Sequence, residues 1–205
     1  AILMAELIQQ GGTEEELDEY WRTLNSELNR QKNLINELLM AGRLESGNMK
    51  LESTSIDLMP TLIESVNAVT AIANKRNISI VLNSEFRYLQ VLGDTGGLQQ
   101  VFINLINNAV KFSPERSMVE VTVTTNDQSA QISISDHGLG IPPESIPHLF
   151  ERFYRAQNVT VAEVSGSGIG LYIVKSILDG LNGSIHVESR IHQGTTFFVG
   201  LPLVK

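Results

Sequence analysis

Hydrophobic residues recur in two different patterns along the chain, and the change falls near residue 50. In the first part they return at alternating steps of four and three, with Gln31 in the one polar slot, at Leu17, Trp21, Leu24, Leu28, Ile35, Leu38 and Gly42. Thr13 followed by Glu16 forms a capping box, which starts a helix. The pattern predicts a helix over residues 14–46 with a heptad seam, typical of a coiled coil or a helical bundle.

Residues 1–10 predict a shorter apolar helix that ends before Gly11 and Gly12. A helix over residues 14–46 is about 50 Å long, and ten residues cover only about 15 Å of it. Most of the seam therefore lacks a partner within this hairpin, and we expect a helical homodimer. The alternative is a helix packed within its own domain.

After Gly47, short β-rich runs alternate with helical stretches. The strands are expected at residues 78–82, 119–125, 130–135, 183–187 and 195–201, and the helices at 58–74, 95–112 and 169–181. Asn126-Asp127 joins the second and third runs as a hairpin. We predict an α+β protein in which residues 1–52 form a helical hairpin and residues 53–205 form an α/β sandwich, a mixed sheet with helices on one face.

Composition excludes several classes of protein. The chain has 205 residues, 42% of them hydrophobic, which is ample for a buried core in one or two domains. Its net charge of −8 disfavours nucleic acid and anionic lipid as partners. It has no cysteine and no apolar run near the roughly 20 residues of a membrane span. We expect a cytoplasmic chain that makes no membrane contact of its own. This expectation includes the cytosolic part of a membrane-bound protein.

The helix expected over residues 95–112 carries a stripe of amides that ends in a lysine. Gln100, Asn104, Asn108 and Lys111 are spaced by four, four and three, apart from the apolar face of the same helix. Carboxamide oxygens are hard neutral ligands for Mg²⁺, and a lysine offers a point charge to a phosphate. The alternative is a solvated helix face.

Two glycine-rich motifs follow this helix. Residues 136–140 read Asp-His-Gly-Leu-Gly after an expected strand, where the carboxylate can accept a hydrogen bond from an adenine amino group. Residues 166–171 read Gly-Ser-Gly-Ile-Gly-Leu and open a helix, whose free N–H groups favour phosphate. The second motif is neither a Walker A loop nor a dinucleotide fingerprint. Taken singly, each is also compatible with an ordinary turn.

Between these motifs lies a polar, small-residue stretch over residues 157–167, which suits a lid over a nucleotide or an ordinary surface loop. Arg152 and Arg155 flank it within the sequence Phe-Glu-Arg-Phe-Tyr-Arg of residues 150–155. One of these arginines could neutralise a γ-phosphate as charge shifts during transfer.

In order and spacing, the motifs at residues 104–112, 136–140, 150–155 and 166–171 resemble the N, G1, F and G2 boxes of sensor histidine kinases. The stretch 93–202 is similar to the ATPase domain that these kinases share with gyrase-type topoisomerases and heat-shock chaperones. The heptad helix and the F box narrow the resemblance to histidine kinases. The resemblance implies ATP and Mg²⁺ as cofactors.

The resemblance also assigns roles to residues. Asn104 and Asn108 would hold Mg²⁺. Lys111 and Arg155 would contact phosphates and carry the catalytic roles. The other expected nucleotide-binding residues are Phe112 and Asp136, both at the adenine, and Gly138, Gly140, Gly166, Gly168, Gly170, Leu171 and Thr195.

The chain departs from the family in one respect. Its four histidines, His137, His148, His186 and His192, all lie outside the His-Glu/Asp-x-x-x-Pro context of a phospho-acceptor. We therefore expect a chain that begins a few residues past the acceptor, and that binds ATP without phosphorylating itself.

The resemblance implies an ATP-dependent protein-histidine kinase core, which passes phosphate to a histidine and then to an aspartate of a response-regulator receiver domain. Two other functions stay open. One is a gyrase- or chaperone-like ATPase, although Gln100 and Asn104 stand where its catalytic carboxylate would be expected. The other is a pseudokinase scaffold that dimerises and binds a partner, which the complete set of nucleotide motifs disfavours.

Overall fold

The structure, a computed structural model, describes residues 13–47, 50–156 and 166–204. The predicted helix at residues 1–10 and most of the predicted lid lie outside these ranges. The long helix is present as α2, Glu14–Glu45. Its capping box is confirmed, since Thr13 Oγ1 accepts from the Glu16 backbone N–H at 3.3 Å and Glu16 Oε2 accepts from the Thr13 N–H at 2.9 Å.

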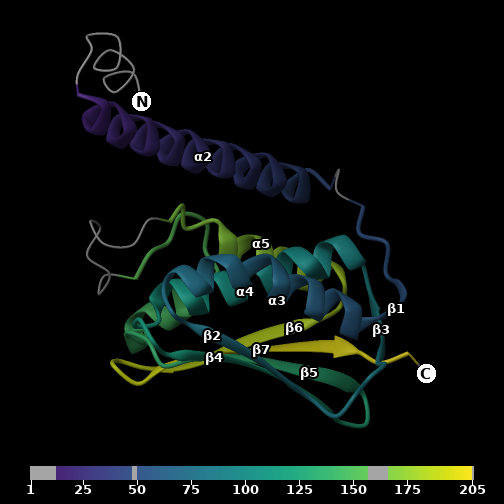
Figure 1. Cartoon of the computed structure of the whole chain (residues 1–205). Helices are drawn as coiled ribbons and strands as arrows, with labels where there is room; N and C mark the ends of the chain where they lie inside the picture. The colour runs from purple at the N-terminus through teal and green to yellow at the C-terminus, as the bar shows by residue number, and fades with distance from the viewer. Residues whose placement is uncertain (1–12, 48–49, 157–165, 205) are drawn as a thin grey trace.

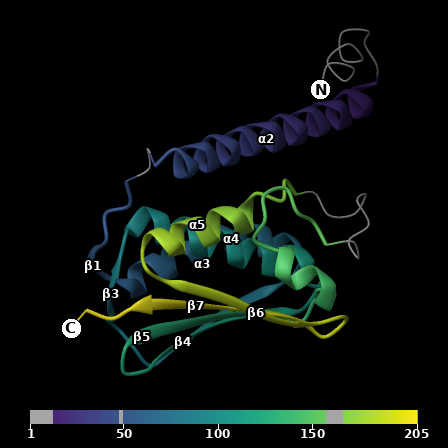
Figure 2. The same ribbon diagram turned by 180° about the vertical axis from the view of Figure 1, so that it is seen from behind.

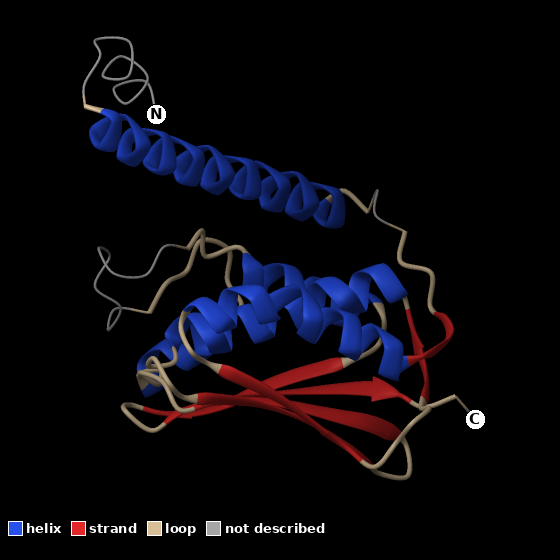
Figure 3. Ribbon diagram, in the orientation of Figure 1, coloured by secondary structure: helices blue, strands red, loops and turns tan. Residues whose placement is uncertain are grey.

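The remainder of the described chain is a two-layer sandwich, which confirms the α+β fold. Three helices cover one face of a five-stranded sheet (Figures 1 and 3). The helices are α3 (Leu58–Lys75), α4 (Thr95–Phe112) and α5 (Gly170–Gly180). In spatial order the strands are β2 (Ser79–Ser84), β4 (Met118–Thr125), β5 (Ser129–Asp136), β7 (Gly194–Pro202) and β6 (Ser184–Arg190).

The sheet is mixed, as predicted: β2 and β4 run parallel and the other neighbours are antiparallel. The predicted hairpin joins β4 to β5 with Thr125 opposite Ala130. The Asn126 side chain closes its turn by accepting from the backbone N–H groups of Gln128 and Ser129, at 3.0 and 2.8 Å. Strand register places alternate residues against the helices, which is why β4 and β5 alternate between buried and partly exposed positions.

The core lies between the sheet and the helix layer. The predicted apolar face of α4 is buried there, at Leu98, Val101, Phe102, Leu105, Ile106 and Ala109. Burial of this face leaves the amide stripe of α4 on the side of the helix away from the sheet.

Three elements were not predicted: β1 (Thr54–Asp57), β3 (Gln90–Gly93), which pair with each other, and the 3-10 helix η1 (Pro143–His148). Their short sequences carry too few apolar positions to show a period. Tertiary contacts hold them instead. The Asp57 carboxylate caps α3 by accepting from the Met59 N–H at 3.2 Å, and it also accepts from the Leu89 N–H at 3.1 Å.

Helix α2 runs along the helix layer on the side opposite the sheet (Figures 1 and 2). Its last third packs on the sandwich, where Ala41 is fully buried and Leu38 joins the core. Trp21, Leu28 and Ile35 of the predicted seam are about half exposed. The heptad seam is therefore divided: its end at Leu38 packs on the chain's own sandwich, whereas Trp21, Leu28 and Ile35 do not. The division into domains at residue 52 stays a prediction.

Candidate functional site

A cavity of about 1070 Å³ lies between α4, the start of α5, the loop after β5 and the middle of α2. Every nucleotide-binding and catalytic residue expected from the sequence borders it: Asn104, Asn108, Lys111, Phe112, Asp136, Gly138, Gly140, Arg155, Gly166, Gly168, Gly170, Leu171 and Thr195. The fold brings together residues that are far apart in the sequence. Their roles in binding remain predictions.

The amide stripe of α4 divides into two parts. Asn104, Asn108 and Lys111 border the cavity, whereas Gln100 donates from Nε2 to Asn104 Oδ1 at 3.0 Å. Asn104 in turn donates from Nδ2 to the Gly170 carbonyl at 3.3 Å. These two hydrogen bonds orient the Asn104 amide and tie α4 to the first residue of α5. Gln100 thus supports the site instead of lining it.

Lys111 lies at the cationic end of the cavity. A Cβ on Gly166 would come within 2.7 Å of Lys111 Nζ, so the ammonium group lies directly against that glycine. Burial lowers the pKa of Lys111, the nearby charge of Arg155 lowers it further, and the carboxylate of Glu37 on α2 raises it. Two cations that destabilise each other would both gain from an anion bound between them.

Asp136 ends β5 as a buried carboxylate on the cavity wall. Burial raises the pKa of Asp136 to about 6. Hydrogen bonds from the backbone of Gly138 and Thr195, and the charge of His137, act in the opposite direction. The Gly138 N–H donates to Asp136 Oδ1 at 2.8 Å, which fixes the carboxylate. At neutral pH the group is an ionised acceptor, suited to an amino donor such as that of adenine.

Two glycines are required by their surroundings. A Cβ on Gly138 would lie 2.3 Å from the Phe112 carbonyl oxygen, so only glycine lets the loop after β5 pack against the end of α4. Gly168 has φ +72° and a missing side chain that would meet the Phe153 backbone at 2.7 Å. The Phe153 N–H donates to the Gly168 carbonyl at 2.9 Å. These contacts join the G1 motif to the N motif, and the G2 motif to the F motif.

Helix α5 begins at the cavity without a side-chain cap from its N-cap residue Ile169. Ser167 Oγ accepts from the Ile169 N–H at 3.1 Å, while Gly170 and Leu171 border the cavity. The first N–H groups of a helix have no intrahelical acceptor and carry the positive end of its dipole. This end of the cavity is therefore suited to phosphate.

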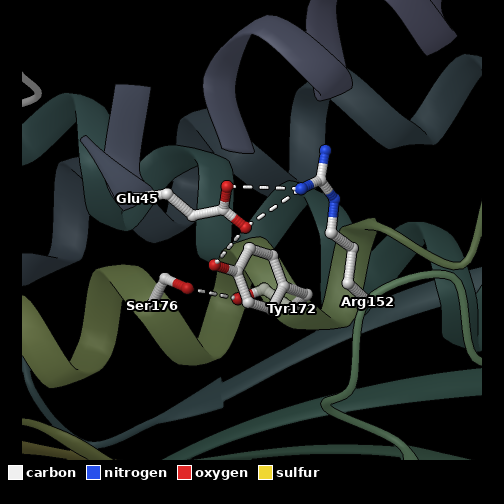
Figure 4. A network of polar contacts seen from close by, with 4 residues as sticks. All are labelled: Glu45, Arg152, Tyr172 and Ser176. Atoms are coloured by element: carbon white, nitrogen blue, oxygen red, sulfur yellow. Dashed lines mark hydrogen bonds and ion pairs between the residues drawn. The ribbon is translucent and has the colours of Figure 1, made fainter. Parts of the chain in front are cut away.

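The two arginines of the F motif have different surroundings. Arg155 borders the cavity, whereas Arg152 donates from Nη1 to both carboxylate oxygens of Glu45, at 3.0 and 3.2 Å (Figure 4). Of the two candidates for a γ-phosphate contact, the geometry favours Arg155.

Residues of α2 and α3, and Arg76 directly after α3, also border the cavity although no nucleotide motif of the sequence indicated them: Arg30, Gln31, Asn33, Leu34, Glu37, Ile72 and Arg76. Ser167 Oγ donates to a carboxylate oxygen of Glu37, so a residue of α2 contacts the G2 motif. These residues were missed because only the tertiary packing of α2 and α3 brings them to the pocket.

Asn104 and Asn108, the residues expected to hold magnesium, fit Mg²⁺ only if a bound phosphate supplies further ligands. Among residues 13–47, 50–156 and 166–204, no group of three or more histidine, cysteine or acidic side chains is placed to hold a metal. Asn104 and Asn108 are one helical turn apart and supply neutral oxygens. Mg²⁺ is commonly held by one or two protein groups plus substrate phosphates and water, and two amides match this arrangement.

Comparisons with known proteins agree with this geometry. Residues 93–205 match the family model described as "Histidine kinase-, DNA gyrase B-, and HSP90-like ATPase". The chain is 29% identical over 202 residues to the sensor-like histidine kinase SenX3 of Mycobacterium tuberculosis, covering 98% of this chain and 49% of SenX3. It is 30% identical over 174 residues to the phosphate regulon sensor protein PhoR of Pseudomonas aeruginosa, covering 85% of this chain and 39% of PhoR.

A solved structure shares the whole arrangement. Full-length ShkA in complex with AMPPNP superposes with a TM-score of 0.78 at 26% identity, over 98% of this chain and 42% of ShkA. The chain thus spans half or less of the length of these relatives. Within the described residues, no helix is both long and apolar enough to cross a membrane.

Proposed function

Because the chain belongs to the histidine kinase-, DNA gyrase B- and HSP90-like ATPase family, on its sensor histidine kinase branch, we propose that it binds Mg-ATP and transfers the γ-phosphate to a protein histidine. The phosphate then passes to an aspartate of a response-regulator receiver domain. The observation that carries the proposal is that all thirteen expected residues border one cavity with an acidic acceptor and a cationic region.

The polarity of the cavity supports one orientation of the nucleotide. Asp136 and Phe112 would contact the adenine, Asp136 by accepting from its amino group. Lys111, Arg155 and the start of α5 would contact the phosphates, and Asn104 and Asn108 would hold Mg²⁺ beside them. The ion would supply neutralisation of the phosphate oxygens. Lys111 and Arg155 would add stabilisation where negative charge shifts in the transition state.

We propose that the histidine that accepts the γ-phosphate is not one of the chain's own histidines. None of the chain's four histidines stands in an acceptor motif. The outward-facing seam of α2, with Trp21, Leu28 and Ile35 about half exposed, supports a homodimer through the helical hairpin. A chain of this kind would bind ATP without phosphorylating itself.

Calorimetry with AMPPNP, in Mg²⁺ and in EDTA, tests the proposal. We expect Mg-dependent binding that Asn108→Ala weakens by about tenfold or more, because removing a ligand lowers affinity for the phosphate-bound ion. The exposed Asn83→Ala on β2 is the control and should bind as the wild type does. No binding, or binding unaffected by Asn108→Ala, would contradict the proposal and favour a scaffold. Rapid ATP hydrolysis without phosphotransfer would favour a gyrase-like ATPase.

A further inference from the structure

We propose that Arg76, outside every sequence motif, is a positioning residue that fixes the last turn of α4 and with it the nucleotide contacts of Lys111 and Phe112. This inference rests on the proposed function. Arg76 directly follows α3, and its guanidinium group reaches the C-terminus of α4. Its Nη1 donates to the carbonyls of Val110 and Lys111 at 2.5 and 2.7 Å, and its Nη2 donates to the carbonyl of Ser113 at 2.8 Å.

The backbone carbonyls at the end of α4 need a hydrogen-bond donor from outside the helix, and the sequence shows why. The Val110 carbonyl of a continuing helix would accept from the N–H of residue 114, but Pro114 has none. Ser113 also leaves the helix in an extended conformation, with ψ 148°. The carbonyls at the end of a helix carry the negative end of its dipole, and a guanidinium group with several donors in a fixed fork matches them.

Arg76 is itself held in place. Its backbone carbonyl accepts from the Arg116 N–H at 3.3 Å, and Ser79 N–H donates to the Ser117 carbonyl at 3.1 Å where the parallel strands β2 and β4 begin. The turn after α3 and the turn after α4 are thereby joined. The guanidinium group of Arg76 therefore bridges the turn after α3 and the end of α4, and the pairing of β2 with β4 keeps these two segments side by side.

The turn that Arg76 holds carries part of the binding site. Lys111 and Phe112 both border the cavity, and the Phe112 carbonyl packs where Gly138 has no side chain. A shift of this turn would move the ammonium group of Lys111 and the ring of Phe112, and would press the Phe112 carbonyl on Gly138 in the loop after β5. Asn104 lies two turns earlier on α4 and is tied to Gly170 independently. Loss of the anchor should therefore impair binding without unfolding the site.

Arg76→Ala and Arg76→Lys test this role by two measurements. We expect Arg76→Ala to weaken AMPPNP binding with Mg²⁺ by about 10- to 100-fold. In the nucleotide-free protein, amide exchange at residues 111–113 should accelerate by about tenfold or more as the last turn frays. For Arg76→Lys, both the affinity and the exchange rate should lie between those of the wild type and Arg76→Ala. A single ammonium group cannot donate to the three carbonyls in the geometry that the guanidinium group provides.

Two control variants separate positioning from charge and from general stability. Arg87→Ala removes the same charge from an exposed site and should change neither measurement. Val123→Ala removes core volume from β4, away from the cavity, and should lower the melting temperature with affinity kept within about twofold. The proposal is overturned if Arg76→Ala weakens binding no more than Val123→Ala at equal loss of stability. It is also overturned if affinity falls while exchange at residues 111–113 stays unchanged, since Arg76 would then contact the nucleotide directly.

Failure of the proposed function gives a different result. A wild-type chain that binds no nucleotide would contradict the kinase proposal. The exchange measurement in the nucleotide-free protein still reports whether Arg76 holds the last turn of α4.

Discussion

Glu45, the last residue of α2, and Arg152 of the F motif form an ion pair across 107 positions of sequence, with oxygen to Nη1 distances of 3.0 and 3.2 Å. Tyr172 of α5 donates its hydroxyl to the same carboxylate at 3.2 Å (Figure 4). One carboxylate of the long helix thus contacts both the F motif and the helix that follows the G2 motif. The position of α2 is coupled to the two segments that frame the predicted lid.

Glu45→Gln should loosen the contact of α2 with the sandwich while leaving the fold intact. Both partners are partly exposed, so the pair contributes only about 0.2–1 kcal/mol to the free energy of unfolding. We expect faster amide exchange over residues 38–45 and an almost unchanged melting temperature. Glu27→Gln removes the pair with Arg30 within α2 alone and should not affect exchange there. Equal rates of amide exchange over residues 38–45 in Glu45→Gln and Glu27→Gln would contradict the coupling of α2 to the sandwich.

Glu37→Gln should tighten nucleotide binding. The Glu37 carboxylate contacts Ser167 and interacts with Lys111, so its charge lies near the proposed phosphate position. Removing about 1 kcal/mol of repulsion corresponds to a roughly fivefold lower Kd for AMPPNP with Mg²⁺. The gain of the variant over the wild type should shrink at high salt, because salt screens the repulsion that the variant removes. Weaker binding would mean that Glu37 assists the nucleotide instead of competing with it.

Nucleotide affinity should fall as the pH is lowered through about 6. Burial raises the pKa of Asp136 to about 6, and only its ionised form accepts a hydrogen bond at both oxygens. The dependence should be absent in Asp136→Asn, which should bind about 10- to 100-fold more weakly at pH 8. Asp127→Asn, an exposed change in the β4–β5 turn, should retain the wild-type profile.

The stability of the nucleotide-free protein should show the opposite pH dependence. The pKa of Asp136 in the folded state lies above the ordinary aspartate value of 3.8, so the folded state binds the proton more tightly than the unfolded state does. The resulting stabilisation is fully present below 3.8 and is lost as the pH rises through about 6. Asp136→Asn should remove this loss and raise the melting temperature above the wild-type value at pH 8. A variant less stable than the wild type at pH 8 would contradict the assignment.

The sequence predicted the fold and the inner surface of the cavity for the same reason. Strand alternation, the period of α4 and the glycine motifs are local patterns, and the buried face of α4 leaves its amides on the opposite side. Glu37, Glu45 and Arg76 were missed because their roles depend on pairing over long distances. Each reads as an ordinary helix-surface charge until α2 and α3 are placed against the sandwich.

The close packing of the G1 motif can be tested by adding a methyl group at Gly138 and, for comparison, at Gly42 of α2. Gly138→Ala should abolish AMPPNP binding and lower the free energy of unfolding by about 2 kcal/mol or more, because the new Cβ would lie 2.3 Å from the Phe112 carbonyl and 2.8 Å from an oxygen of Asp136. Gly42→Ala places the same methyl group on α2, where nothing lies within 4 Å apart from the neighbouring residues and the backbone of the helix itself, and should stabilise the helix by about 0.5–1 kcal/mol. Melting curves and calorimetry on both variants make the comparison. If Gly138→Ala bound nucleotide like the wild type, the end of α4 and the loop after β5 would not need their close packing, and the adenine end of the site would have to be placed elsewhere.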